Sequence, residues 1–517
     1  MGAKRALLWT SWASRAAALS LAAGALVAMA GCGAKSASRT LTVGIDSPFA
    51  TLDPHHHNDA YTWSLLSNFY DGLVRFSPEM KLEPALAESW EQLGVDRWRF
   101  HLRPGVRFHG GETLTAADVV ASFERARRDP RSGIRHHLVG IERMVAEGDL
   151  DLLVETDGPR PTLLNRLAFL FVVPRRDAGL GEISRPNGTG PYRVERAVNG
   201  QSVTATAFAG WHGMPEIRDV QFVCDSDLHR LFRRFVAGEI DVLRQIPEDQ
   251  IGELRNWPRL RVEPQPRLAV QLLAVRTSGK GSPAAAALAD PRVRRAILLA
   301  LDRRGWVGEV YRGYAVVASQ YVHPVVAGYD PAASVPPFDP DEARRLLREA
   351  GYADGFEVEL QYADTKTAVM PTIASDLGRV GIRVRLRELP WTELMQRAPG
   401  GGSDLTYLAW QCSTGDASDF FNACVHSHSS ALGLGAQNYS HFADPEVDRL
   451  LEAADREFDA GKRLDLLQEA QRQTLAKLPL LPLTVRWAFL GASDRVEVVC
   501  RHDQWLWVAA YRWREPA

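Results

Sequence analysis

The sequence is poor in cysteine and has no excess of positive charge. It contains five cysteines in 517 residues, and none of them stands in a C-x-x-C spacing, which argues against a redox motif or a zinc ribbon. Its formal charge is −2, and without the three basic residues of the first 31 positions the charge falls to about −5. Because nucleic acid is bound by basic surfaces, this balance argues against nucleic acid as a partner.

The sequence also lacks the short motifs that mark common enzyme classes. It has no nucleophile elbow, no H-E-x-x-H and no phosphate loop. After residue 31, no apolar stretch is long enough to cross a ~30 Å hydrocarbon core as a helix. We therefore expect no enzyme and no cofactor, while a nucleophile and a base assembled from distant residues, as in a lipid-anchored hydrolase, are an alternative.

The first residues have the features of an export signal. Three basic residues precede an apolar run over residues 16–30, which ends in Met-Ala-Gly-Cys32. These are the n-region, the h-region and the small-residue cleavage site of a secretory signal. Cys32 directly after Ala-Gly resembles the bacterial lipobox, which implies a signal peptide over residues 1–31 and a lipid on the Cys32 thiol. An ordinary secretion signal with an incidental cysteine is the alternative. Residues 32–39 are small or polar and predict a flexible tether.

The remaining four cysteines lie in a chain that we expect to be exported. An oxidising compartment permits disulfides, and four cysteines allow three full pairings. Two of them stand close in sequence and can close a small loop, but the sequence does not select a pairing. The four positions are Cys224, Cys412, Cys424 and Cys500.

Strand and helix patterns alternate along the chain and predict an α/β fold. Thr115 and Asp118 form a capping box for a helix that runs to about Arg128. Residues 339–351 have an Asp N-cap, a Pro at the first helical position and a Gly at the end of a second helix. Strand, helix and strand patterns within residues 356–386 indicate a parallel βαβ unit.

Eight stretches in a fixed order resemble one family, the peptide- and nickel-binding family of bacterial extracytoplasmic solute-binding proteins. One stretch alone is weak, but the ordered set covers nearly all of the chain after the tether. The stretches are TLDPH at 51–55, LAESWE at 86–91, WRFHLRPGVRFHGGETLTAADVVASF at 98–123, GTGPY at 188–192, AGEIDV at 237–242, DPRVRRAILLALDR at 290–303, FDPDEARRLLREAGY at 338–352 and NYSHFADPEVDRLL at 438–451.

These stretches identify the fold and are expected to be structural themselves. GTGPY, for example, looks like a turn that enters a strand, in which Gly188 and Gly190 can take positive φ.

The resemblance implies a periplasmic binding protein-like α/β fold with two lobes around a cleft. The first lobe would comprise residues 40–268, with an extra subdomain at about 85–187, and would be completed by residues 481–517. The second lobe would comprise residues 269–480, so that the chain crosses between lobes near residues 269 and 480. Closure of the lobes about these crossings would enclose a ligand.

The segment after Leu408 is the candidate ligand wall that the resemblance implies. Trp410 matches the family's aromatic residue, and Asp416 matches a later acidic position. Ser413 stands where peptide-binding members have an Asp that pairs with a free amino group. Because a buried ammonium needs a counter-charge, Ser413 puts free-amino peptides in doubt. The alternatives are that Trp410 is plain core and that Asp416 is the amine anchor.

Two further positions are candidates for ligand contact. We expect His55 to line the cleft, with His56 and His57 solvated. Three consecutive histidines point in different directions and rarely ligate one ion, so we expect no metal site. Arg276, near the first crossing, offers a positive charge to a ligand carboxylate; a hinge role and a solvated surface arginine are the alternatives.

We therefore expect the substrate-binding component of an ABC importer, located outside the cytoplasm and anchored to the membrane by lipid. Its partners would be a peptide or other small-molecule ligand and the permease and ATPase subunits. A sensor or adhesin that reuses the binding fold is the alternative from a different functional class.

Overall fold

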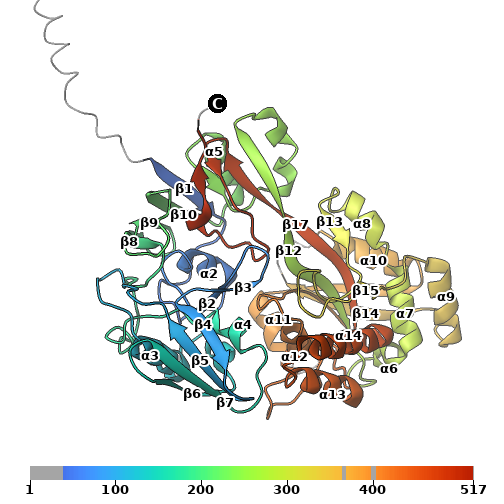
Figure 1. Ribbon diagram of the computed structural model, residues 1–517. Helices are drawn as coiled ribbons and strands as arrows, with labels where there is room; N and C mark the ends of the chain where they lie inside the picture. The colour runs from blue at the N-terminus through green and yellow to red at the C-terminus, as the bar shows by residue number, and fades with distance from the viewer. Residues whose placement is uncertain (1–38, 364–367, 398–402, 516–517) are drawn as a thin grey trace, which may run out of the picture. The chain divides into compact units, whose positions relative to one another are not determined.

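The computed structural model describes residues 39–363, 368–397 and 403–515, and Figure 1 shows their arrangement. In this part of the chain one large sheet has the strand order β15-β14-β16-β12-β17-β11-β1-β10-β9-β8, with β13 beside β17. Its strands are β1 (Thr40–Ile45), β8 (Tyr192–Val198), β9 (Ser202–Ala207), β10 (Asp219–Cys224), β11 (Val242–Leu243), β12 (Leu260–Val275), β13 (Ala315–Val317), β14 (Phe356–Ala363), β15 (Ile382–Leu389), β16 (Leu405–Gln411) and β17 (Leu480–Ser493).

Two long strands lie at the centre of this sheet. β12 and β17 pair antiparallel from Leu260 opposite Ser493 to Ala274 opposite Leu480, with irregular register around residues 266–270. The expected crossings near residues 269 and 480 fall in these two strands, which Figure 1 shows side by side between the two halves of the sheet. The boundaries of the lobes themselves stay a prediction.

The expected βαβ unit is confirmed. β14 pairs in parallel with β15, and α10 (Met370–Gly378) connects them. β14 also pairs in parallel with β16. The carboxyl ends of these three strands therefore lie at one edge of the sheet, where open α/β sheets bind ligands.

A separate sheet forms within the expected extra subdomain. Its strand order is β4-β5-β7-β6, and all of its pairings are antiparallel. The helix α3 (Ala116–Arg128) packs beside it (Figure 1). The strands are β4 (Ala87–Gln92), β5 (Arg97–Leu102), β6 (Ile141–Ala146) and β7 (Asp151–Thr156).

The helix starts that the sequence indicated are confirmed. The Thr115 N–H donates to Oδ2 of Asp118 at 2.9 Å at the start of α3. Oδ1 of Asp339 accepts from the Glu342 N–H at 3.0 Å at the start of α9 (Pro340–Glu349). The other α-helices are α2 (Ala60–Leu66), α4 (Leu163–Leu167), α5 (Leu228–Val236), α6 (Ala285–Ala289), α7 (Pro291–Ala300), α8 (Arg303–Glu309), α11 (Trp391–Arg397), α12 (Ser418–Cys424), α13 (Pro445–Ala454) and α14 (Ala460–Lys477).

The expectation of positive φ at Gly188 and Gly190 is wrong. Neither glycine is among the residues with positive φ. Instead, a Cβ at Gly188 would lie 2.1 Å from the carbonyl oxygen of Phe69, and a Cβ at Gly190 would lie 2.5 Å from the carbonyl carbon of the same residue. Close approach of two backbones, rather than the φ angle, therefore requires glycine here.

Two large apolar cores hold these elements together. One joins strands and helices of the N-terminal half to α12–α14 and includes Phe100, Phe222 and Phe420. The other lies among α7, α9, α10 and β14 and includes Ile297 and Ile373. None of the helices in the described ranges is both long and apolar enough to span a membrane.

Candidate functional site

The candidate ligand wall is the loop between β16 and α12, at the carboxyl end of a parallel strand. β16 ends at Gln411, and α12 begins at Ser418. The loop touches segments of the expected first lobe: Nδ2 of Asn165 donates to the Thr414 carbonyl at 2.7 Å, and Gly415 lies against Met80. The loop is thus placed where two distant parts of the chain meet.

Trp410 is half-buried at the end of β16. Its ring makes an edge-to-face contact with Phe420 at a centroid distance of 6.0 Å. Its indole Nε1 is buried and has no hydrogen-bond partner among the described residues. A buried indole N–H normally finds an acceptor, so this donor is available to a ligand. Whether Trp410 contacts the ligand stays a prediction.

Asp416 is engaged by the protein itself and is not free to receive an ammonium group. Its Oδ2 lies 2.5 Å from Nη1 of Arg463, and its Oδ1 lies 2.8 Å from Nη2 of the same guanidinium. Oδ1 also accepts the N–H of Ser418 at the start of α12. This buried, bidentate pair joins the loop to α14, which gives Asp416 a structural role.

Ser413 is half-buried in the turn before Asp416, and its backbone N–H donates to the Gln411 carbonyl at 3.0 Å. A hydroxyl carries no charge at any pH of interest, so this position supplies no counter-charge for an ammonium group.

Asp419 is the acidic residue at this loop that the sequence reasoning passed over. It is half-buried in the first turn of α12, and burial raises the pKa of its carboxyl to about 6, against the opposing effect of Arg166. The charge of Asp416 raises the pKa of Asp419 further, and Thr414 donates a hydrogen bond that lowers it. Its signal in the sequence was weak, because an acid in the first turn of a helix is also an ordinary helix-start residue.

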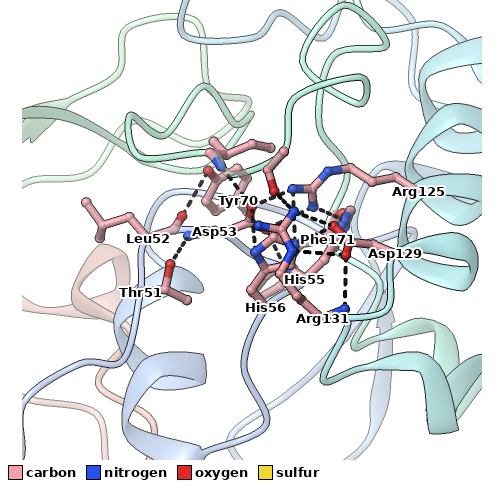
Figure 2. Close-up of polar contacts among 12 residues, drawn as sticks. Thr51, Leu52, Asp53, His55, His56, Tyr70, Arg125, Asp129, Arg131 and Phe171 are labelled. Carbon is pink, nitrogen blue, oxygen red and sulfur yellow. Dashed lines mark hydrogen bonds and ion pairs between the residues drawn. The ribbon is translucent and has the colours of Figure 1, made fainter.

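His55 is placed in the protein interior, in the network that Figure 2 shows. It is fully buried, and its Nε2 lies 2.9 Å from the Phe171 carbonyl. Its Nδ1 accepts from Nη1 of Arg125 at 2.8 Å, because a guanidinium only donates. Arg125 in turn forms a buried ion pair with Asp53 at 2.5 Å. Burial lowers the pKa of His55 to about 4, so the ring is neutral at neutral pH.

This network corrects the expectation for the three histidines. His55 has no exposed surface for a ligand, and its two ring nitrogens are both used by the protein. His56 and His57 are not solvated either: the His56 side chain lies 2.8 Å from the carboxylate of Asp129, and His57 is buried against the Trp63 ring. Three consecutive histidines suggest an exposed segment, but His55 is buried and contacts the carbonyl of Phe171.

Arg276 is buried rather than solvated. Its Nε donates to the Ser403 carbonyl at 2.9 Å, and its Nη1 donates to the Lys280 carbonyl at 3.1 Å. These bonds tie together two loops beside the end of β12. The surface-arginine alternative is therefore wrong, and ligand contact by Arg276 stays a prediction.

The structure also shows the state of the four remaining cysteines and of the candidate metal ligands. The four cysteines of the described ranges are all free thiols, with Cys412 and Cys424 buried. Within those same ranges, no group of three or more His, Cys, Asp or Glu side chains is arranged to hold a metal ion. Cys32 lies outside the described residues.

Similar solved structures define the fold of the protein. HbpA2 from Haemophilus parasuis matches with a TM-score of 0.80 and 24% identity, over 92% of this chain and 100% of that chain. The dipeptide binding protein from Pseudoalteromonas sp. SM9913, in complex with Met-Leu, matches with a TM-score of 0.77 and 23% identity, over the same shares. The fold is therefore that of the two-lobed periplasmic binding proteins, as the sequence resemblance implied.

The family follows from the sequence itself. The model of the bacterial extracellular solute-binding proteins, family 5, matches residues 81–431, more than half of the chain, and the chain belongs to this family. Its curated relatives include the glutathione-binding protein GsiB of Pectobacterium atrosepticum, 27% identical over 479 residues that cover 89% of this chain and 90% of the relative. GsiB of Escherichia coli K12 is 27% identical over 468 residues, with 87% and 89% covered.

Family membership confirms the function at the level of the family. The chain is an extracytoplasmic solute-binding protein with the substrate-binding role for an ABC importer, and its family is one of binding proteins rather than enzymes.

Proposed function

We propose that this protein captures a peptide or a related small solute by closure of its two lobes and delivers it to the permease of an ABC importer. A lipid on Cys32 would hold it at the membrane. The observation that carries the proposal is the match to the family. Relatives whose alignments cover about nine-tenths of the chain also support it. The relatives are named for glutathione, and solved neighbours hold the dipeptide Met-Leu and mannopinic acid.

The site favours a ligand without a free amino group. Ser413 brings no carboxylate to the expected amine position, and the carboxylate of Asp416 is held by Arg463. An ammonium group enclosed without a partner costs several kcal/mol, which few closed clefts offset. A solute with a blocked amino end, a sugar or another neutral polar head avoids this cost. Trp410 would supply an aromatic wall and an unused N–H donor.

Calorimetry with matched free and N-acetylated tripeptides tests this ligand class. We expect the acetylated form to bind more tightly, and Ser413→Asp to shift the preference toward the free form. The rival anchor is Asp419, whose carboxylate has no ion-pair partner among the described residues. Tight binding of the free form that Asp419→Asn abolishes would contradict the proposal and make the protein an ordinary peptide receptor.

A further inference from the structure

Three arginines converge where the two long strands cross the sheet. Arg244 follows β11 directly, Arg267 belongs to β12 and Arg486 belongs to β17. Val270 of β12 pairs with Trp410 on one side and with Val485 on the other. Arg486 is therefore one residue beyond the level of Trp410, and its side chain lies on the opposite face of the sheet, over the Tyr311 ring.

The pairing of β12 with β17 is irregular at Arg267. Pro266 pairs with Trp487 and Val270 pairs with Val485, so residues 267–269 together stand opposite Arg486 alone. Such bulges turn a side chain away from the regular alternation of the strand, and they are common beside functional sites. Arg267 and Arg244 are close enough for their charges to act on each other, as are Arg267 and Arg486.

Two of the three arginines form ion pairs with carboxylates of the protein. Nη1 of Arg244 lies 2.9 Å from Oδ1 of Asp46, and the guanidinium stands 4.2 Å from the centre of the Tyr61 ring. Arg486 forms an ion pair with Glu248. Both pairs are largely shielded, with side-chain exposures of 10% and 13% for the first and 27% and 29% for the second.

Arg267 has no such partner. Its Nη2 donates to Oε1 of Gln245 at 3.0 Å, and no carboxylate of the described residues lies within ion-pair distance of it. The Nε of Arg267 is buried and makes no hydrogen bond with the described residues. The Nε atoms of Arg244 and Arg486 are likewise buried and make none. The group thus has three cations, two carboxylates and three unused donors in a shielded place.

A bound anion would balance the excess positive charge of the three arginines. A shielded charge without a counter-charge is costly, and a guanidinium recognises a carboxylate through two parallel N–H donors. Burial lowers the pKa of Arg267 to about 10, with help from the charges of Arg486 and Arg244, so the side chain still carries its charge at neutral pH.

We propose that Arg267, supported by Arg244 and Arg486, binds a carboxylate of the transported solute at the crossing strands. The proposal rests on the solute-binding function proposed above and narrows it: the solute carries at least one carboxylate, which Arg267 binds. Arg267 is the specificity residue, because its two neighbours already bind carboxylates of the protein.

Isothermal titration calorimetry with two matched probe pairs tests the proposal. The probes are an N-acetylated tripeptide with apolar side chains and its C-terminal amide, and succinate and succinamide, at matched ionic strength. We expect the acids to bind the wild type more tightly than the neutral forms. Arg267→Gln should weaken binding of the acids about tenfold or more, because charge-assisted hydrogen bonds are lost, and should leave the neutral forms unchanged. Arg267→Lys, which keeps the charge and loses the fork, should fall between.

Arg449→Gln is the matched control, since Arg449 is an exposed arginine on α13 paired with Glu446. It should bind every probe as the wild type does. Circular dichroism of Arg267→Gln should match the wild type, which separates lost binding from lost folding. The proposal is overturned if acid and neutral forms bind alike, or if Arg267→Gln binds the acids as the wild type does. In either case, capture of some other solute by the wild type leaves the proposed function standing. Failure of the wild type to bind any solute overturns both.

Discussion

At the residue scale, Asp416 shows what sequence reasoning could not see. The sequence left Asp416 open as an alternative amine anchor, and in the structure its carboxylate is paired with Arg463, which lies 47 positions further along the chain. The sequence does not reveal that pairing, because α14 meets the loop only through tertiary packing. The same holds for His55, whose partners come from Arg125 and Phe171.

The structural role of Asp416 predicts a large loss of stability. Asp416→Ala should lower the free energy of unfolding by about 3 kcal/mol or more, because it leaves the buried Arg463 guanidinium without a counter-charge. Denaturant unfolding measures this loss, and Arg463→Met in the same chain should recover part of it. The control Glu446→Ala removes an exposed pair with Arg449 and should cost no more than about 1 kcal/mol. Equal losses in the two alanine variants would contradict the structural role.

Asp419 predicts a pH dependence with a definite sign. Its pKa in the folded protein, about 6, lies above its ordinary value of 3.8, so the folded state disfavours the ionised carboxyl. That cost is fully present above about pH 6 and disappears as the pH falls toward 4. Asp419→Asn should therefore raise the melting temperature at pH 7.5, and the gain should shrink to nearly nothing near pH 4. The facing groups Arg166, Asp416 and Thr414 are unchanged in the variant.

Thermal unfolding of both proteins across this pH range provides the measurement. A melting temperature difference that stays constant from pH 7.5 to pH 4 would show that the Asp419 carboxyl titrates normally, and would remove burial as the cause of its raised pKa.

At the scale of the element, local sequence rules were enough to predict where a helix begins. The helix that begins with an Asp N-cap and a Pro was predicted from four or five neighbouring residues, and the structure has it at Asp339. Gly188 and Gly190 show the limit of such rules. Their turn was recognised, but the reason for glycine was the backbone of Phe69, which stands far away in the sequence.

The cap of α9 offers a test with an internal control. Asp339→Ala removes the side-chain oxygen that accepts the Glu342 N–H and should cost about 1 kcal/mol of unfolding free energy. Asp341→Ala, one residue into the same helix, removes an exposed acid paired with Arg344 and should cost about 0.5 kcal/mol or less. Denaturant midpoints of the two variants give the comparison, and a smaller loss for Asp339→Ala would contradict the capping geometry.

At the scale of the whole molecule, ordered motifs predicted more than any physical pattern did. Periodicity gave strands, helices and one parallel βαβ unit, but not the strand order of the large sheet. The eight stretches in family order predicted the fold and the solute-binding role, which the family match and the solved neighbours confirm. The arginine group at the crossing was beyond reach, because Arg244, Arg267 and Arg486 are brought together by three strands.

Membrane attachment through Cys32 is a further prediction at this scale. Cys32→Ala should move the protein from the membrane fraction to the soluble fraction, because the thiol would carry the first lipid. Fractionation followed by immunoblotting measures this shift. Cys500→Ala, which changes a half-buried free thiol in the folded part, is the control and should stay with the membrane. Membrane association of the Cys32→Ala variant equal to that of the wild type would contradict lipid anchoring.

The central claim is that this protein binds one small solute and releases it chemically unchanged. Native mass spectrometry of the protein, purified without denaturation from its own cell envelope, tests this most directly. We predict one non-covalent solute per chain, released intact on denaturation and found to carry a carboxylate. A purified protein that holds no solute and gains none from an extract of small molecules, or that returns the solute chemically altered, would contradict the account.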